Sequence, residues 1–134
     1  RDRAVDVDPF GRRAGAVEER DGVLAPNDPL MTFPNEISES TWKNWVQERG
    51  TYFIDATGPQ YTELIQVNEP FENNRGWKKG ALVEAAVGKG RWIYVGLGLW
   101  RQLAAGTDGA YQLFANLISR GKLPGSPARA TSKP

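Results

Sequence analysis

Hydrophobic residues between Gly80 and Ser119 form two short runs and then a longer periodic segment. Ala81 to Val87 and Trp92 to Leu97 have the length of strands and are rich in β-branched and aromatic residues. Gly88 and Gly90, in the Gly-Lys-Gly sequence between the runs, can supply the positive φ that a tight hairpin requires. The pattern therefore predicts two adjacent antiparallel strands joined by this turn.

The segment after the second run has helical periodicity, because its apolar residues recur at the spacing of one helix face: Tyr111, Phe114, Ala115 and Ile118. We predict a helix near 110–120 that packs on the sheet through Tyr111, Phe114 and Ile118. If Phe114 is fully buried, its truncation to Ala should cost roughly 3 to 5 kcal/mol. Strand, turn, strand and helix together are typical of the closing unit of an α/β domain.

A second helix is predicted over about Glu39 to Glu48, with Ser38 as its N-cap. Trp42, Trp45 and Val46 lie at positions i, i+3 and i+4 and form its inward face. A tryptophan pair can also stack on sugar rings. Core packing is the favoured interpretation, since this spacing is what a packed helix shows.

Two further strands are predicted, at Tyr52 to Ile54 and at Glu63 to Val67, separated by a Gly-Pro turn. The polar stretch from Asn68 to Lys79 is predicted to be a long loop, which in a small domain is either a binding loop or a flap. Trp77 is its large apolar side chain. Burial of Trp77 against the fold and exposure for a partner both remain open.

The ends of the chain differ from its middle. The first 22 residues are charged and rich in glycine, and we interpret them as a surface segment. Residues 122–134 are rich in Pro, Ser and Lys, which predicts a disordered tail. We therefore expect residues 1–121 to form a single α/β domain or the C-terminal half of one. No internal repeat is evident.

Composition argues against most enzyme classes. The 134 residues include no His and no Cys, the side chains most used for nucleophile activation, proton transfer near neutral pH and zinc ligation. We therefore expect no enzyme, no catalytic residue, no metal site and no cofactor. A carboxylate pair with glycosidase chemistry remains the alternative.

Charge and hydropathy also narrow the possible partners. The net charge of +1 gives no field that favours nucleic acid. No apolar run approaches the roughly 20 residues of a transmembrane helix. Neither nucleic acid nor a membrane-spanning segment is therefore expected.

Candidate binding residues are polar side chains near the ends of predicted elements: Glu48, Arg49, Arg101 and Gln102. In open α/β sheets, ligands bind beyond the carboxyl ends of strands, which favours Arg101 and Gln102. The structural alternative is preferred: Arg101 pairs with a carboxylate such as Glu48, and Gln102 holds the loop before the last helix. Trp77 is the further candidate.

Four segments carry a family resemblance: NDPLMTFPNEI (27–37), WVQERGTYF (45–53), GKGRWIYVGLGLWRQL (88–103) and GAYQLFANLIS (109–119). They resemble the C-terminal region of large bacterial PIG-L (LmbE-like) deacetylases, in which this region follows a zinc-dependent sugar deacetylase domain. The resemblance implies a class I glutamine amidotransferase-like or ThuA-like fold, here a partial flavodoxin-like layered sheet with a C-terminal hairpin and helix. It also implies a secreted or periplasmic protein.

No catalytic residue is carried over by this resemblance. The zinc motif of the deacetylases has no match here, and neither do the cysteine and histidine of the amidotransferases. The leading hypothesis is a non-catalytic accessory module of a carbohydrate-processing protein, for assembly or glycan contact. The alternative is a structural subunit that docks into a larger protein complex. A sheet that lacks its first half exposes an edge, so we expect a protein partner or self-association, with a glycan as a possible ligand.

Overall fold

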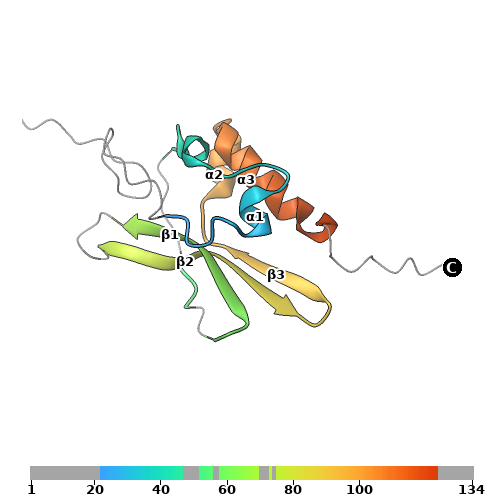
Figure 1. Ribbon diagram of the computed structural model, residues 1–134. Helices are drawn as coiled ribbons and strands as arrows, with labels where there is room; N and C mark the ends of the chain where they lie inside the picture. The colour runs from blue at the N-terminus through green and yellow to red at the C-terminus, as the bar shows by residue number, and fades with distance from the viewer. Residues whose placement is uncertain (1–21, 47–51, 56–57, 70–72, 74, 124–134) are drawn as a thin grey trace, which may run out of the picture.

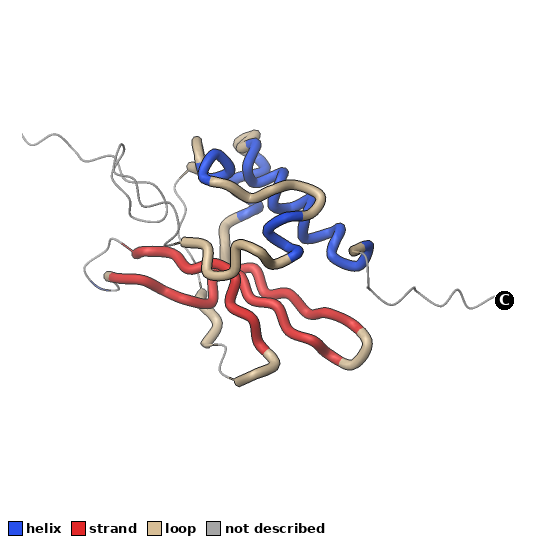
Figure 2. Tube along the Cα trace, viewed as in Figure 1, coloured by secondary structure: helices blue, strands red, loops and turns tan. Residues whose placement is uncertain are grey.

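The chain is a mixed α/β structure in which helices cover one side of a three-stranded antiparallel sheet (Figures 1 and 2). The computed structural model describes residues 22–46, 52–55, 58–69, 73 and 75–123. Its elements follow in the order α1 (Pro29–Thr32), η1 (Glu39–Trp42), β1 (Tyr61–Glu69), β2 (Gly76–Val87), β3 (Gly90–Val95), α2 (Leu99–Ala104), α3 (Asp108–Ser119) and η3 (Arg120–Lys122). The sheet has the order β1-β2-β3.

The hairpin predicted from the sequence is confirmed. β2 and β3 pair antiparallel, from Leu82 opposite Val95 to Val87 opposite Gly90, without a register shift. Gly88 has φ 57°, whereas Gly90 does not adopt a positive φ. A glycine with positive φ at the first of two turn positions is typical of a type II′ turn, so one of the two predicted glycines carries the turn.

β1 and β2 form a bent pair. The register shifts twice along β1, between Glu63 and Ile65 and between Ile65 and Val67. On β2 the irregularity contains Gly80, with φ 83°. A Cβ atom on Gly80 would lie 2.1 Å from the carbonyl oxygen of Ile54, so only glycine allows this close approach.

Two sequence predictions in this region were wrong. Residues 52–55 form no strand, although the Ile54 amide donates to the Gly80 carbonyl at 3.3 Å. The predicted long loop over 68–79 is strand at both ends, because β1 continues to Glu69 and β2 begins at Gly76. Trp77 therefore lies within the sheet, opposite Asn68. Cross-strand pairing outweighed the polar composition of the segment.

The outer edge of β1 pairs with residues 22–24, the first residues that the structure describes. Val23 bridges to Ile65 in antiparallel fashion. The Leu24 amide donates to the Leu64 carbonyl and the Gln66 amide donates to the Gly22 carbonyl, each at 2.9 Å. This part of the β1 edge is therefore paired, whereas β3 forms the other edge of the sheet.

The core lies between the sheet and the helices. One contiguous cluster joins apolar side chains of the sheet to those of the helical layer: Leu30, Met31, Trp42, Trp45, Leu64, Ile65, Val67, Ala81, Leu82, Leu97, Ala110 and Leu113. Most of these side chains are fully buried. The cluster includes the indole rings of Trp42 and Trp45, whose centroids are 5.1 Å apart.

The C-terminal helix is present, but it uses a different face from the one predicted. Ala110 and Leu113 are fully buried in α3, as is Asn116. The predicted inner residues Tyr111, Phe114 and Ile118 are exposed. The predicted cost of Phe114→Ala rested on full burial of this ring and is therefore too large. Close packing decided the outcome, because a Cβ atom on Gly109 would lie 1.6 Å from the Thr41 carbonyl oxygen.

The helix predicted over 39–48 is much shorter. η1 is a single 3-10 turn that begins after Ser38 and ends at Trp42, and the backbone then becomes extended at Lys43 and adopts φ 62° at Asn44. Trp42 and Trp45 are buried as predicted, whereas Val46 is 39% exposed. The indole N–H of Trp45 donates to the Thr41 carbonyl at 2.7 Å. Together with hydrogen bonds of Thr41 and Val46 to Gln112 and Gln102, this contact fixes the segment without a regular helix.

The described structure extends slightly into the predicted tail. Lys122 ends η3, and Leu123 is buried. Residues 124–134, the rest of that tail, lie outside the described residues, as does the N-terminal segment 1–21.

Candidate interaction surfaces

The residues predicted as a binding site are not gathered in one place. Arg101 and Gln102 both lie on α2, directly after β3. Trp77 lies on β2 and is 40% exposed. Glu48 and Arg49 lie outside the described residues. The candidates thus belong to at least two separate parts of the fold.

Gln102 is fully buried and has a structural role. Its Oε1 accepts from the Val46 amide at 2.9 Å, and its Nε2 donates to the Val46 carbonyl at 2.6 Å. The Thr107 hydroxyl also donates to Oε1 at 3.3 Å, and the Thr107 amide donates to the Gln102 carbonyl at 3.0 Å. These contacts match the structural interpretation, since Gln102 holds both the loop before α3 and the segment after Trp45.

Arg101 lies beside an exposed aromatic ring. Its guanidinium carbon is 4.8 Å from the centroid of the Trp100 ring, and Trp100 is 71% exposed. Cation–π contacts at exposed positions contribute about 0.5 to 1 kcal/mol. This pair offers a flat, amphipathic contact on the outer side of α2.

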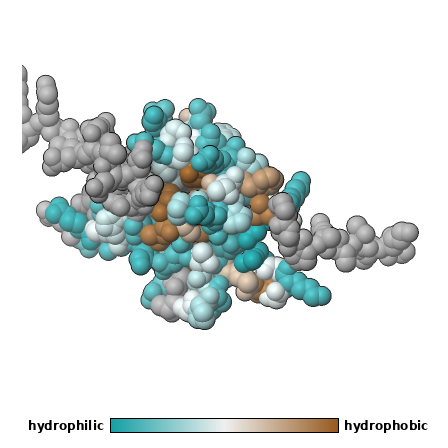
Figure 3. All heavy atoms as spheres, viewed as in Figure 1, coloured by the Kyte–Doolittle hydropathy of each residue, from teal (hydrophilic) through white to brown (hydrophobic). Residues whose placement is uncertain are grey.

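The outward side of α3 is apolar. Tyr111, Phe114 and Ile118 are 51%, 41% and 66% exposed, and their spacing of three and four residues places them on one helix face. The hydroxyl of Tyr111 donates to the Leu103 carbonyl at 2.8 Å, which fixes this ring against the end of α2. We call these three residues the outer face of α3. In Figure 3, brown and tan atoms are visible on the surface near the point where the grey C-terminal trace leaves.

A second aromatic group lies on the side of the sheet that faces away from the helices. Tyr61 and Trp92 both pair with Ala85 across the sheet, so all three side chains share one face. The Trp92 ring packs edge-on against Tyr61, with centroids 6.5 Å apart, and stacks with Tyr94 at 6.2 Å. The Tyr94 hydroxyl donates to the Tyr52 carbonyl at 2.8 Å. We call Tyr61, Trp92 and Tyr94 the aromatic sheet face.

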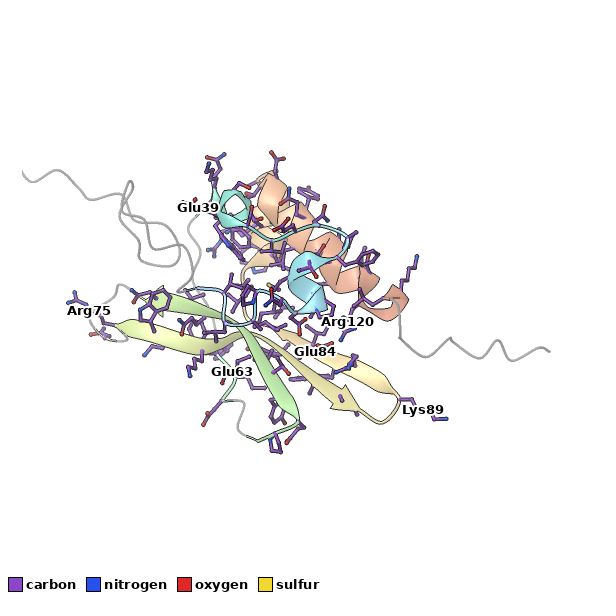
Figure 4. All side chains as sticks on the ribbon, viewed as in Figure 1. Glu39, Glu63, Arg75, Glu84, Lys89 and Arg120 are labelled. Carbon is purple, nitrogen blue, oxygen red and sulfur yellow. The ribbon has the colours of Figure 1, made fainter. Side chains whose placement is uncertain are left out.

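A buried ion pair joins the sheet to the C-terminal end of α3. Glu84 is 3% exposed and accepts from Arg120 in bidentate form, from Nε at 2.5 Å and from Nη2 at 3.3 Å. Arg91 Nε lies 3.9 Å from the same carboxylate. Figure 4 shows Glu84 and Arg120 between the sheet and the helix, whereas Lys89 points outward from the hairpin turn. The geometry suits a structural contact, because both partners are occupied with each other.

Sequence reasoning missed Glu84, although the sequence contained a signal for it. Glu84 is the charged residue within the apolar run Ala81 to Val87. A carboxylate within a buried strand requires a partner, so its position already indicated an ion pair. The outer face of α3 was recognised as apolar, but it was assigned to the core.

The described residues contain no group of three or more Asp or Glu side chains placed to hold a metal ion. Within those residues, no helix combines the length and apolar character needed to cross a bilayer. Comparison of the chain with protein families, curated proteins and solved structures gives no match. The surfaces carry apolar rings and paired charges, which is chemistry suited to binding.

Proposed function

We propose that this chain is a non-catalytic α/β accessory module that acts by binding another polypeptide through the outer face of α3. The observation that carries the proposal is the exposure of Tyr111, Phe114 and Ile118 on a helix whose neighbouring stripe forms the core. Exposed apolar residues that gather on one surface are typical of protein-binding sites. An isolated exposed side chain would carry no such argument.

The helix is a suitable platform for docking. Its inner residues Leu113 and Asn116 are fully buried, so the outer face is presented on a fixed element. Tyr111 is additionally held by its hydrogen bond to Leu103. Binding therefore requires little ordering of these rings, which lowers the entropic cost of association. Aromatic residues on such a face are the groups that most often dominate binding energy.

The parent protein that we propose rests on the sequence resemblance. It is a carbohydrate-processing protein of the PIG-L deacetylase type, secreted or periplasmic, in which this region has a partial flavodoxin-like, amidotransferase-like architecture. In that setting the outer face of α3 packs on the preceding deacetylase domain. In the alternative, the chain is a structural subunit and the same face docks onto a separate protein of a larger complex.

The test uses a PIG-L-type deacetylase domain, supplied as a separate polypeptide, as the binding partner. It is co-produced with this chain, and their association is measured by calorimetry for the wild-type chain and for Phe114→Ser and Ile118→Ser. We expect each substitution to weaken binding at least tenfold, because each removes apolar contact area from the interface. Lys89→Ser, at the hairpin turn, is the matched surface control and should bind like the wild type. Equal affinities for all four proteins would refute docking through α3.

Glycan contact is the second candidate, favoured by the aromatic sheet face. Trp92 is 40% exposed between two tyrosines, and Tyr52, which is 76% exposed, borders the same group. Aromatic rings can stack on the apolar faces of sugars while their polar tips donate hydrogen bonds. Quenching of tryptophan fluorescence by soluble oligosaccharides, compared between the wild type and Trp92→Leu, tests this role independently of α3. Absence of saturable quenching in the wild type would exclude it.

A further inference from the structure

The outward side of β3 has backbone groups that the sheet does not use. In a two-residue hairpin the closing pair, Val87 and Gly90, is hydrogen-bonded, and hydrogen-bonded pairs then alternate along the strands. The amide of Gly96 donates to the Ala81 carbonyl at 2.7 Å, which agrees with this alternation. The N–H and C=O groups of Arg91, Ile93 and Val95 therefore point away from β2.

These groups form a regular open edge. β3 contains no proline and no bulge, and within the described part of the chain no backbone segment pairs with its outer side from 90 to 95. The neighbouring segment 52–55 approaches only the end of the strand, where a Cβ atom on Gly96 would lie 2.6 Å from the Tyr52 carbonyl oxygen. Unpaired edge strands are templates for another extended chain.

We infer that β3 pairs with β3 of a second copy of this chain, antiparallel and centred on Ile93, so that two three-stranded sheets join into one. In this register Ile93 faces its own symmetry mate and Arg91 faces Val95. All outward groups of the strand then have partners. Registers centred on residue 92 or 94 leave one of these three residues unpaired.

Side chains favour the same register. On the open side of the sheet, Trp92 of each copy lies opposite Tyr94 of the other, so the aromatic sheet face continues across the interface. Aromatic cross-strand pairs stabilise antiparallel strands. Arg91 never lies opposite another cation, and in each copy its guanidinium remains within 3.9 Å of Glu84. The strand is thus complementary to itself.

The opposite edge of the sheet is paired over part of its length, which disfavours further association through that edge. β1 is already covered near Ile65 by Val23 and its neighbours. Pairing of two identical β3 edges is isologous and closes on itself, whereas edges free on both sides would allow open-ended association. Such a contact is small, so we expect a concentration-dependent dimer rather than an obligate one.

The experiment compares Ile93→Pro with Ile93→Ala by sedimentation velocity over a wide concentration range. The wild type should approach twice its mass of 14.8 kDa as concentration rises. Proline removes an amide that points outward, so the hairpin retains its internal hydrogen bonds while the dimer is lost. Ile93→Ala trims the same side chain but keeps the amide, and it should dimerise at least tenfold more tightly than Ile93→Pro. Phe114→Ser should leave the dimer intact.

A second measurement does not depend on the folding of any variant. Hydrogen exchange of the wild type at low and high concentration should show protection at the amides of Arg91, Ile93 and Val95 that increases with dimer population. A wild type that stays monomeric, or a dimer without protection of these amides, overturns the inference. A dimer lost in Phe114→Ser but kept in Ile93→Pro would assign self-association to α3 and also overturns it. Failure of partner binding through α3 would leave the β3 result unaffected.

Discussion

The β2–β3 hairpin and the helical layer above it are held by different kinds of contact. The hairpin is a continuous backbone ladder between residues close in sequence, closed by a turn at Gly88. In the helical layer, buried amide side chains bind backbone groups far away in sequence. Gln102 holds Val46 in this way, and Asn116 holds Leu30 and Asn35.

The hairpin and the helical layer should therefore respond differently to amino-acid substitutions. A backbone ladder does not depend strongly on any one exposed side chain, so the hairpin should tolerate most single substitutions at its solvent-exposed positions. The buried side chains of β2, such as Leu82, belong to the core and are excepted. A buried amide has no substitute, because its removal leaves several backbone groups without partners. We therefore expect the largest losses of stability at buried positions of the helical layer and the smallest at exposed positions of the hairpin.

The largest expected loss of stability distinguishes the buried apolar stripe of α3 from the exposed one. Leu113→Ala should lower the free energy of unfolding by about 2 to 5 kcal/mol, because it opens a cavity in the core. Phe114→Ala removes a larger side chain that is 41% exposed, so we expect a loss below about 1 kcal/mol. Urea denaturation of both variants measures this contrast. A greater loss for Phe114→Ala would mean that the outer stripe, not the inner one, is buried.

Asn116→Ala is expected to be nearly as damaging. Asn116 is fully buried, its Oδ1 accepts from the Asn35 amide at 2.9 Å, and its Nδ2 donates to the Leu30 and Asn35 carbonyls at 2.8 and 2.7 Å. Loss of these partners should cost about 3 kcal/mol, since each buried group left unpaired costs about 1 to 3 kcal/mol.

The control for Asn116 is Gln112→Ala, because Gln112 lies on the same helix and is less buried. Its Oε1 accepts from the Thr41 hydroxyl at 3.2 Å. We expect a loss of about 1 kcal/mol. Thermal unfolding followed by circular dichroism compares the two, and equal losses would contradict the special role of Asn116.

The sequence predicted the hairpin because the information for it is local. Two strand-length runs rich in β-branched and aromatic residues around a glycine turn specify a strand pair without reference to the rest of the chain. The sequence did not predict the end of η1 at Trp42. The apolar residues of this segment keep helical spacing as far as Val46. The Val46 backbone, however, is hydrogen-bonded to the side chain of Gln102, 56 residues away. A pattern within ten residues carries no signal for such a contact.

The choice of the buried face of α3 was unpredictable for a similar reason. Two apolar stripes run along the helix, and the bulkier one was the natural choice from the sequence. Instead, the stripe of smaller residues faces the core. Gly109 lies close to the Thr41 carbonyl oxygen on this side, and the Asn116 side chain hydrogen-bonds to the Leu30 and Asn35 carbonyls. Of the candidate site, the sequence thus identified the apolar residues but not their exposure. Exposure depends on contacts with residues that are distant in the sequence, such as those of Asn116 with Leu30 and Asn35.

The ion pair between the two layers should have an intermediate effect. Glu84→Gln keeps the shape of the side chain but removes its charge, so the ion pair with Arg120, whose side chain is 12% exposed, becomes a hydrogen bond to a neutral acceptor. We expect a loss of about 1 to 3 kcal/mol in the free energy of unfolding. Glu63→Gln is the matched control, because its contact with Lys79 is 4.0 Å long and more exposed, and it should change stability by less than about 0.5 kcal/mol. Similar losses in both variants would argue against a buried pair.

The smallest expected loss of stability comes from a substitution in the hairpin turn, where only the backbone conformation is affected. Gly88 has φ 57°, and no atom lies within 4 Å of the position that a Cβ would occupy. Gly88→Ala therefore meets no steric neighbour, and its cost is that of a left-handed conformation, about 1 kcal/mol. Gly90→Ala is the control two residues later, where φ is not positive and the nearest atom, the Val87 carbonyl oxygen, is 3.6 Å away. We expect Gly90→Ala to be neutral or slightly stabilising, because alanine reduces the freedom of the unfolded chain. Chemical denaturation of both variants decides the point: if they lose stability equally, the turn does not depend on the positive φ of Gly88, and the local explanation of the hairpin is wrong.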